Sequence, residues 1–327
     1  MLKDTLLTLL SIPGPSGSEG ACADYIEETV RPYVDQIDRD VMGNLICIKH
    51  AAEGARRVML TAHMDEIGFI VTAIEERGFL RVTNIGGVNP KVTTANHVVM
   101  KSGAQGVLFT EAGSSKDALF IDIGASSKEE AEKKAQVGDW AVVRGAVSDM
   151  GDKIAAPYLD DRSGCAVLIE TLKRLKNSKD EIIAVFTTQE EVGLRGALVA
   201  GYAVAPDMAI ALDVTIAGDY PRSNESNCYV VSHLGKGPAV KIMDRGVIAH
   251  PAVVQEMEEA AVKAGVQVQR EVLTGGATDV GAIHTTRAGV PSGTLSIPCR
   301  YVHAPCETVD LNDMEGAVRL LEEMLRG

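Results

Sequence analysis

The stretch Ile182-Ile-Ala-Val-Phe-Thr-Thr188, an apolar run that passes directly into Gln189-Glu190-Glu191, decides the fold of this chain. A short apolar run bounded by polar residues is typical of a strand that is covered on both faces. Two other runs have the same form: Val58-Met-Leu-Thr-Ala62 ends in His63, and Met208-Ala-Ile-Ala-Leu212 ends in Asp213. The three runs together predict the centre of a mostly parallel sheet.

Helical patterns follow and alternate with these strands. Residues 162–176 have Leu168, Leu172 and Leu175 at spacings of four and three, which predicts a helix that packs on the sheet. A further amphipathic helix is predicted from about Asn312, with Leu321 among the residues of its apolar face. The expected fold class is therefore α/β, with a mostly parallel central sheet flanked by helices.

The pattern of apolar and polar residues changes between about residues 67 and 155. Alternating stretches such as Phe69-Ile-Val-Thr-Ala-Ile74 and Phe79-Leu-Arg-Val-Thr83, separated by Gly-rich turns, are typical of short antiparallel strands. We therefore expect a discontinuous α/β domain, residues 1–66 and 156–327, interrupted by a small β-rich domain at 67–155.

Composition excludes some classes of partner. The chain has 327 residues, is 46% hydrophobic and carries a formal charge of −13. Nucleic-acid binding needs clustered Lys and Arg, so we expect no nucleic-acid partner. No apolar stretch of the sequence reaches the length of a membrane span, so we expect no membrane partner.

Two features bear on the cellular compartment. Residues 1–10 carry Asp4 inside a short apolar segment, which predicts an amphipathic helix rather than a signal peptide. The six cysteines form no CxxC pair and no dense framework, a usage that suits reduced thiols. We therefore expect a cytoplasmic protein.

Five potential metal ligands stand where apolar runs give way to polar turns. In a parallel sheet, functional groups gather outside the carboxyl ends of the strands. Two histidines and three carboxylates collected there are chemically suited to a pair of divalent ions, zinc foremost, with cobalt or manganese as alternatives. The five residues are His63, Asp160, Glu191, Asp213 and His303.

His63 and Asp160 each have a structural explanation as well as a functional one. Asp65 follows His63 by two residues, so its carboxylate can accept the imidazole N–H that does not bind metal; alternatively, His63 is a surface histidine before a turn. Asp160 can cap the helix that follows, or bridge two cations.

The adjacent pair Glu190 and Glu191 is the sharper signal. Two carboxylates at the rim of a core cost desolvation and repulsion unless a positive charge is near. One of them can coordinate metal while its neighbour shuttles a proton; the alternative is a solvated strand end.

Five motifs occur in the same order as in the glutamyl/tetrahedral aminopeptidase family of di-metal exopeptidases, and the sequence resembles that family over nearly its full length. The motifs are Ala62-His-Met-Asp65, Leu159-Asp-Asp-Arg162, Gln189-Glu-Glu-Val-Gly193, Leu212-Asp213 and Arg300-Tyr-Val-His303.

The resemblance implies a zinc-exopeptidase-like fold in which residues 1–66 and 156–327 form the catalytic metallopeptidase domain. It also implies two metal ions per subunit and a role for each motif. His63 and Asp213 are then ligands of different metals, Asp160 bridges the two, and Glu191 and His303 complete the set. Glu190 is the implied general base, and the peptide bond between Asp160 and Asp161 is implied to be cis. The family also implies peptide substrates, cleaved one N-terminal residue at a time, and an insert that dimerises and builds hollow twelve-subunit particles.

Two rival interpretations come from other functional classes. A glycosidase needs two carboxylates that face each other across a sugar, whereas Glu190 and Glu191 are neighbours and the histidines would have no role. In a scaffold protein with structural metals, each ion would usually be enclosed by four protein ligands, often cysteines. Glu190 would then have no role. The preferred N-terminal residue cannot be predicted from these motifs.

Overall fold

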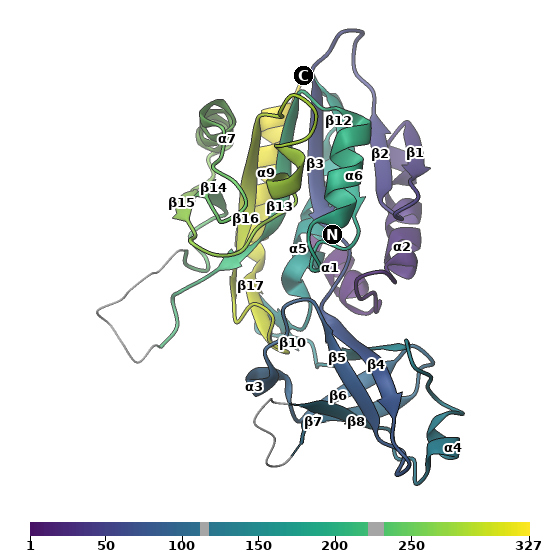
Figure 1. The fold of residues 1–327 in the computed structure, drawn as a ribbon. Coiled ribbons are helices and arrows are strands. Elements are labelled where there is room, and N and C mark those ends of the chain that lie inside the picture. The colour runs from purple at the N-terminus through teal and green to yellow at the C-terminus, as the bar shows by residue number, and fades with distance from the viewer. Residues whose placement is uncertain (112–117, 222–231) are drawn as a thin grey trace.

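The computed structural model describes residues 1–111, 118–221 and 232–327. These residues form one large mixed sheet with helices around it, and a separate closed barrel that lies at one end of it (Figure 1). The predicted α/β class is confirmed.

The large sheet contains eleven strands. They are β1 (Gln36–Arg39), β2 (Leu45–Lys49), β3 (Arg57–His63), β10 (Ser148–Asp149), β11 (Lys153–Ala156), β12 (Glu181–Thr187), β13 (Met208–Ile216), β14 (Ala239–Met243), β15 (Gln269–Val272), β16 (Ser292–Arg300) and β17 (Glu307–Asp310). The longer helices are α1 (Leu2–Leu10), α2 (Gly20–Val30), α5 (Leu159–Arg174), α6 (Arg195–Val204), α7 (Pro251–Ala264) and α9 (Leu311–Leu325). The short ones are α3 (Pro90–Thr93), α4 (Lys128–Ala131), α8 (Val280–Ile283) and the 3₁₀ turn Arg31–Tyr33.

The three apolar runs form neighbouring strands, as predicted. In the order β12, β3, β13 and β16, each strand is parallel to the next. Most pairs outside this centre are antiparallel: β2 pairs with β12, and β17 pairs with both β16 and β11, whereas β14 and β15 are parallel to each other. The expectation of a mostly parallel sheet is therefore wrong for the sheet as a whole, which is mixed around a parallel centre. Short polar strands such as β17, with the sequence Glu-Thr-Val-Asp, carry no apolar run that would reveal them.

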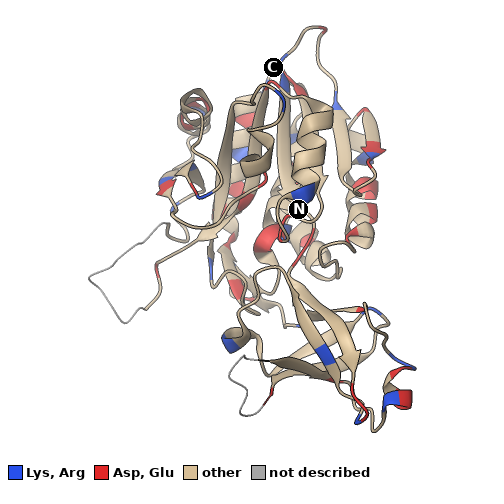
Figure 2. Ribbon diagram, in the orientation of Figure 1, with Lys and Arg blue, Asp and Glu red and all other residues tan. Residues whose placement is uncertain are grey.

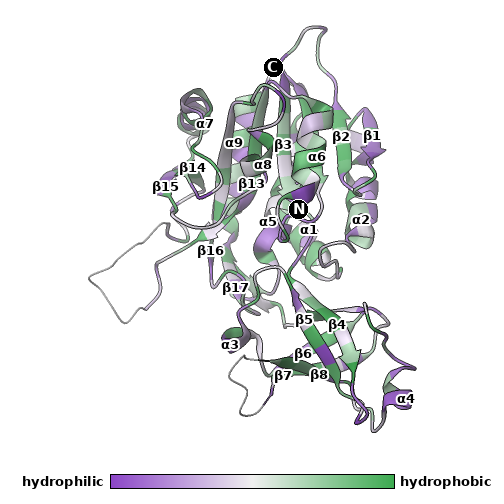
Figure 3. Cartoon of the chain, in the orientation of Figure 1, coloured by the Kyte–Doolittle hydropathy of each residue, from purple (hydrophilic) through white to green (hydrophobic). Residues whose placement is uncertain are grey.

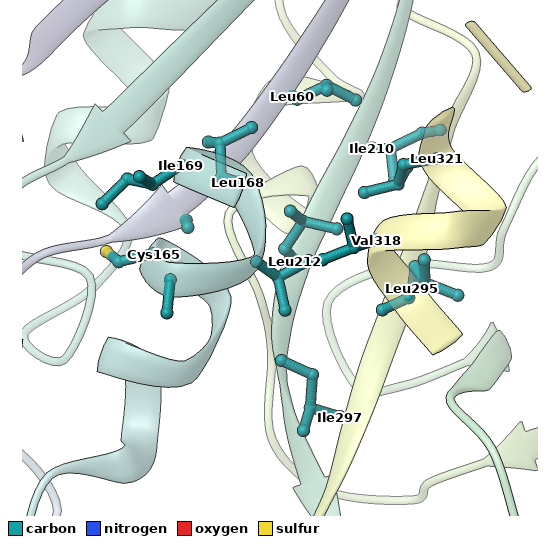
Figure 4. Packing of buried hydrophobic residues seen from close by; sticks show 14 of the residues in the cluster. Leu60, Cys165, Leu168, Ile169, Ile210, Leu212, Leu295, Ile297, Val318 and Leu321 are labelled. Atoms are coloured by element: carbon teal, nitrogen blue, oxygen red, sulfur yellow. The ribbon is translucent and has the colours of Figure 1, made fainter. Parts of the chain in front are cut away.

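Alternating side chains of the central strands fill two cores, one on each face of the sheet. Leu60 of β3 packs with residues of α5 and α9, whereas its neighbour Met59 packs with residues of α6 and α8. Figure 4 shows the first core, where Leu168 on α5 and Val318 on α9 approach the strands. This packing fixes the carboxyl ends of the strands as a rigid edge.

The barrel has its own core. Its strands are β4 (Gly68–Ile74), β5 (Leu80–Ile85), β6 (Asn96–Met100), β7 (Gln105–Thr110), β8 (Leu119–Asp122) and β9 (Trp140–Val143), closed in the order β4-β5-β8-β7-β6-β9. Phe69, Leu80 and Ile121 are among the residues buried inside it. Figure 3 shows hydrophobic residues along these strands and a hydrophilic α4 on the outside.

Charged residues of both signs are spread over several elements in the view of Figure 2, with acidic ones in excess along α2. Among the described residues, no helix is both long enough and apolar enough to cross a membrane.

Candidate metal centre

The register of the parallel strands brings the predicted ligands together. Thr61 of β3 lies opposite Ala211 of β13, so His63 and Asp213 follow at the same level of the sheet. His63 also lies beside Thr187, the last residue of β12, so that the turn carrying Glu190 and Glu191 begins next to it. The site therefore forms where neighbouring parallel strands end, as such sheets favour.

One cluster consists of His63, Asp160 and Asp213, which are all buried and each offer a ligand atom within 4.8 Å of the others. Nε2 of His63 lies 3.0 Å from Oδ1 of Asp160 and 3.9 Å from Oδ1 of Asp213. Asp160 lies at the start of α5, where its own backbone and that of Asp161 depart from helical geometry. The peptide bond between Asp160 and Asp161 is cis, as the resemblance implied.

A second cluster consists of Asp160, Glu191 and His303, again with one ligand atom each within 4.8 Å. Nε2 of His303 lies 3.1 Å from Oε1 of Glu191 and 3.4 Å from Oδ2 of Asp160. Asp160 is thus common to both clusters, and it offers a different carboxylate oxygen to each histidine.

Glu190 belongs to neither cluster of candidate ligands, yet it lies beside them. Its Oε2 is 3.9 Å from Nε2 of His63, and its side chain is 10% exposed. The backbone N–H groups of Glu190 and Glu191 donate to the carboxylate of Asp65 at 2.9 and 3.2 Å. The turn after β12 is therefore anchored at its first two acidic residues.

Asp65 has a different relation to His63 from the one expected. Its backbone carbonyl oxygen lies 3.1 Å from Nδ1 of His63, whereas its carboxylate Oδ1 lies 3.6 Å away. The carboxylate instead accepts hydrogen bonds from the hydroxyl of Ser16, at 2.6 Å, and from the two backbone groups of the β12 turn. The backbone thus orients the imidazole, and the carboxylate orients the turn that carries Glu190.

Burial shapes the electrostatics of the cluster. It raises the pKa of Asp213 well above its usual range, and the charge of Asp160 adds to that effect. Burial likewise raises the pKa values of Glu190 and Glu191, against the opposing influence of His63 and of a hydrogen bond from His303, respectively. The pKa of Asp160 stays below its usual range, because hydrogen bonds from His303 and His63 outweigh its burial.

These properties fit divalent cations. A cation beside the carboxylates would favour their charged forms and so reverse the raised pKa values of Asp213 and Glu191. The two clusters offer imidazole nitrogens and carboxylate oxygens, a mixed set that suits zinc, cobalt or manganese.

Two residues that contact the candidate ligands were not predicted. Glu307 is buried and accepts hydrogen bonds from the backbone N–H groups of Asp160, at 2.9 Å, and of His303, at 2.6 Å. The carbonyl oxygen of Gly87, in the loop after β5 of the barrel, lies 2.9 Å from Nδ1 of His303. Only the apolar-to-polar boundary before Glu307 could have drawn attention to either residue.

The clusters open into a cavity of about 480 Å³. Apolar walls come from residues such as Leu194, Ile216 and Leu273, and residues 275–278 form part of its rim. The buried Lys241 also lines the cavity, with Nζ 3.4 Å from Oε1 of Glu271. The cavity has room for a small side chain next to the clusters.

The sequence of this chain is similar to those of known proteins. The sequence profile of the M42 glutamyl aminopeptidase family matches residues 43–320. The lysyl aminopeptidase of Pyrococcus furiosus is 34% identical over 340 residues, which cover 97% of this chain and 94% of that protein.

Solved structures agree along the whole chain. An aminopeptidase from the archaeon Desulfurococcus kamchatkensis has a TM-score of 0.94 and 38% identity, covering 99% of this chain and 94% of its own. The Pyrococcus horikoshii TET1 peptidase, described as able to assemble into a tetrahedron or a large octahedral shell, has a TM-score of 0.85 and 32% identity, covering 100% and 99%. The chain therefore belongs to the M42 glutamyl aminopeptidase family and is a hydrolase that acts on peptides.

Proposed function

We propose that this chain is a di-metal aminopeptidase that hydrolyses N-terminal residues from short peptides, with Glu190 as the general base. The observation that carries the proposal is the pair of ligand clusters that share Asp160. A single carboxylate common to two sets of His and acidic ligands can hold two ions close together, which suits a two-metal site.

The proposed ligands are His63 and Asp213 on different ions, Asp160 between them, and Glu191 and His303 for the rest of the set. When bound, two such ions lower the pKa of a water molecule and polarise the scissile carbonyl. We propose zinc as the native metal, with cobalt or manganese as possible substitutes, on the chemistry of the donor set.

The chain's own residues then move the protons. Glu190 lies near the clusters without belonging to them, so its carboxylate is free to take a proton from water as the water attacks the carbonyl. The same carboxylate gives that proton to the leaving amine. Burial raises the pKa of Glu190 in the metal-free protein, and metal ions bound at the clusters would lower it again toward the charged form that a general base needs.

Selection of the peptide N-terminus follows from charge. The site concentrates buried carboxylates, and a free α-amine is the positively charged group that every peptide carries at that end. Binding of the amine beside the clusters would place the first peptide bond of the substrate at Glu190, so that one residue is removed at a time.

Hydrolysis of an aminoacyl anilide with and without a chelator tests this function. Activity that disappears with the chelator and returns with added zinc, cobalt or manganese is expected. A glycosidase would leave the anilide intact, and a scaffold with structural metals would hydrolyse no substrate. A panel of aminoacyl anilides assayed with each metal would also identify the preferred N-terminal residue and the best metal.

We also propose a division of labour between the two parts of the chain. Residues 1–66 and 156–327 would form the catalytic domain, and residues 67–155 would form a domain that dimerises and leads to a hollow dodecamer. Support comes from the separate core of the barrel and from the assemblies described for the P. horikoshii TET1 peptidase. The hairpin of β10 and β11 lies largely inside the range 67–155, but it pairs with β17 of the large sheet. We therefore assign this hairpin to the catalytic domain rather than to the inserted one.

A cytoplasmic location completes the proposal. It is supported by the five cysteines among the described residues, all of which are free. Cys228, the sixth, lies outside the described residues.

A further inference from the structure

His303 is the most exposed of the five proposed ligands, with a side-chain exposure of 29% against 10% or less for the others. It lies in a turn after β16 with a φ of +64°, in the left-handed region that few non-glycine residues adopt. Its position therefore depends on the contacts around it. Two of these fix it directly: its backbone N–H donates to Glu307, and its ring Nδ1 contacts the carbonyl oxygen of Gly87.

The contact with Gly87 determines which ring nitrogen can bind a metal. A carbonyl oxygen only accepts hydrogen bonds, so Nδ1 of His303 must carry the proton. Nε2 is then the nitrogen that faces Glu191 and Asp160. A histidine ligand commonly donates its other ring N–H in this way, which fixes the ring and raises its basicity.

The two glycines of this loop allow the approach. A Cβ on Gly87 would lie 2.8 Å from Nδ1 and 2.9 Å from Cε1 of His303. Gly86 has a φ of +76°, and a Cβ there would lie 2.7 Å from Cγ2 of Ile67 and 3.2 Å from Cβ of Glu191. The loop thus presses its backbone against two members of the same cluster, Glu191 and His303.

We infer that Gly87 is a positioning residue for His303, and that the barrel thereby helps to hold the second cluster in place. The loop continues from β5, which is paired with β4 and β8 inside the barrel. His63, by contrast, is oriented by the carbonyl of Asp65, two residues along its own chain segment. The two histidines are therefore held by the same chemistry from different parts of the fold. This inference rests on the proposed function, because it concerns a ligand of the proposed metal pair.

The test is a titration of metal-free protein with Co²⁺. Binding is monitored by visible absorption and by the heat released or absorbed, measured by calorimetry. Wild-type protein should bind two ions per chain. In Gly87→Ala, one ion should bind as in wild type and the other roughly 10- to 100-fold more weakly, the usual effect of losing an outer partner of a metal ligand. The matched control is Gly106→Ala: a Cβ there would lie 2.7 Å from the carbonyl oxygen of Asp122, elsewhere in the barrel. That variant should bind both ions normally.

A second background separates positioning from damage to the fold. In His303→Asn, the ring that Gly87 orients is gone, so adding Gly87→Ala should cause no further loss of Co²⁺ affinity. The inference is overturned if Gly87→Ala binds both ions as wild type does, if it weakens both equally, or if its effect persists in the His303→Asn background. If wild-type protein binds no Co²⁺ at all, the proposed function fails together with the inference about Gly87. If only the inference fails, wild-type protein still binds Co²⁺.

Discussion

At the scale of single residues, the separation of Glu190 from the two ligand clusters has a direct consequence. Glu190→Gln keeps the size of the side chain and removes its ability to take a proton. We expect turnover to fall roughly 10²- to 10⁴-fold while both metal ions are retained. Metal content by atomic emission, measured alongside kcat, checks this. Metal loss in step with activity would make Glu190 a ligand and contradict its assignment as the base.

The protonation of His303 predicts how metal affinity varies with pH. In the metal-free protein, burial alone would lower its pKa, but hydrogen bonds with Asp160 and Glu191 outweigh burial and raise the pKa to about 12. The ring therefore holds an extra proton at neutral pH, and a metal ion must displace it. We expect metal binding to release protons and to tighten as the pH rises.

Calorimetry in two buffers with different ionisation enthalpies measures this release. The apparent heat should differ between the buffers for wild type. The matched control is His50→Ala, which removes an exposed histidine paired with Glu181, far from the site; it should leave the proton count unchanged. A heat that does not depend on the buffer would show no net proton release and would contradict this prediction.

The candidate ligands were predictable because each follows an apolar run or opens a helix. Both kinds of boundary are visible in the sequence. The role of Gly87 was not, since it acts through a backbone carbonyl that every residue possesses, and across 216 positions of sequence. Asp65 shows the intermediate case. Its residue type suggested a carboxylate partner for His63, but the backbone oxygen of the same residue lies closer.

At the scale of elements, a buried ion pair ties α5 to the junction between the sheet and the barrel. Arg162, fully buried in α5, donates to Glu66 at 2.9 Å and to Sγ of Cys22 on α2 at 2.6 Å. Glu66 also accepts the backbone N–H of Gly14. Because removal of one partner leaves a buried charge, Arg162→Met should destabilise the fold by about 3–5 kcal/mol.

Urea unfolding at fixed protein and metal concentrations measures this loss. The matched control is the double variant Arg162→Met with Glu66→Gln, which removes both charges and should lose clearly less than the single variant. An equal loss in the two would mean that packing around Arg162, rather than the unpaired carboxylate, sets the cost.

Elements differ in how well the sequence revealed them. β3, β12 and β13 are visible because strands covered on both faces need apolar side chains throughout. β17 and β10 are short and polar, and they exist because hydrogen bonds to β16 and β11 complete the edge of a sheet that is already formed. β10 has two residues and β17 has four, which is too short for a periodic pattern, so the parallel centre was predicted and these short strands were not.

At the scale of the whole molecule, the outer surface of the barrel predicts how copies assemble. Val107 and Phe109, both on β7, are 38% and 49% exposed, and the ring of Phe109 lies tilted beside that of Phe120 on β8. If the barrel is the dimerisation surface, Phe109→Glu places a charge in an apolar contact and should reduce the mass of the particle. Light scattering on metal-loaded protein measures it.

The control for this surface is Val41→Glu, at a fully exposed residue between β1 and β2. It should leave the mass of the wild-type assembly unchanged. A wild-type protein that is a stable monomer with full activity would contradict the assembly itself, and an unchanged mass for Phe109→Glu would move the contact to another face.

The strand order of the sheet also governs when the enzyme can become active during its synthesis. His63 and Asp213 stand on neighbouring strands, but His303 follows β16, which comes 76 residues after β13 ends. A nascent chain that has emerged only as far as β13 holds His63, Asp160 and Asp213 but lacks the strand that precedes His303, the last of the proposed ligands. If His303 is a ligand, such a chain could fold part of its centre without completing the proposed site. On the proposed function, the newly made polypeptide would then be inert toward the exposed N-termini around it until translation has passed β16.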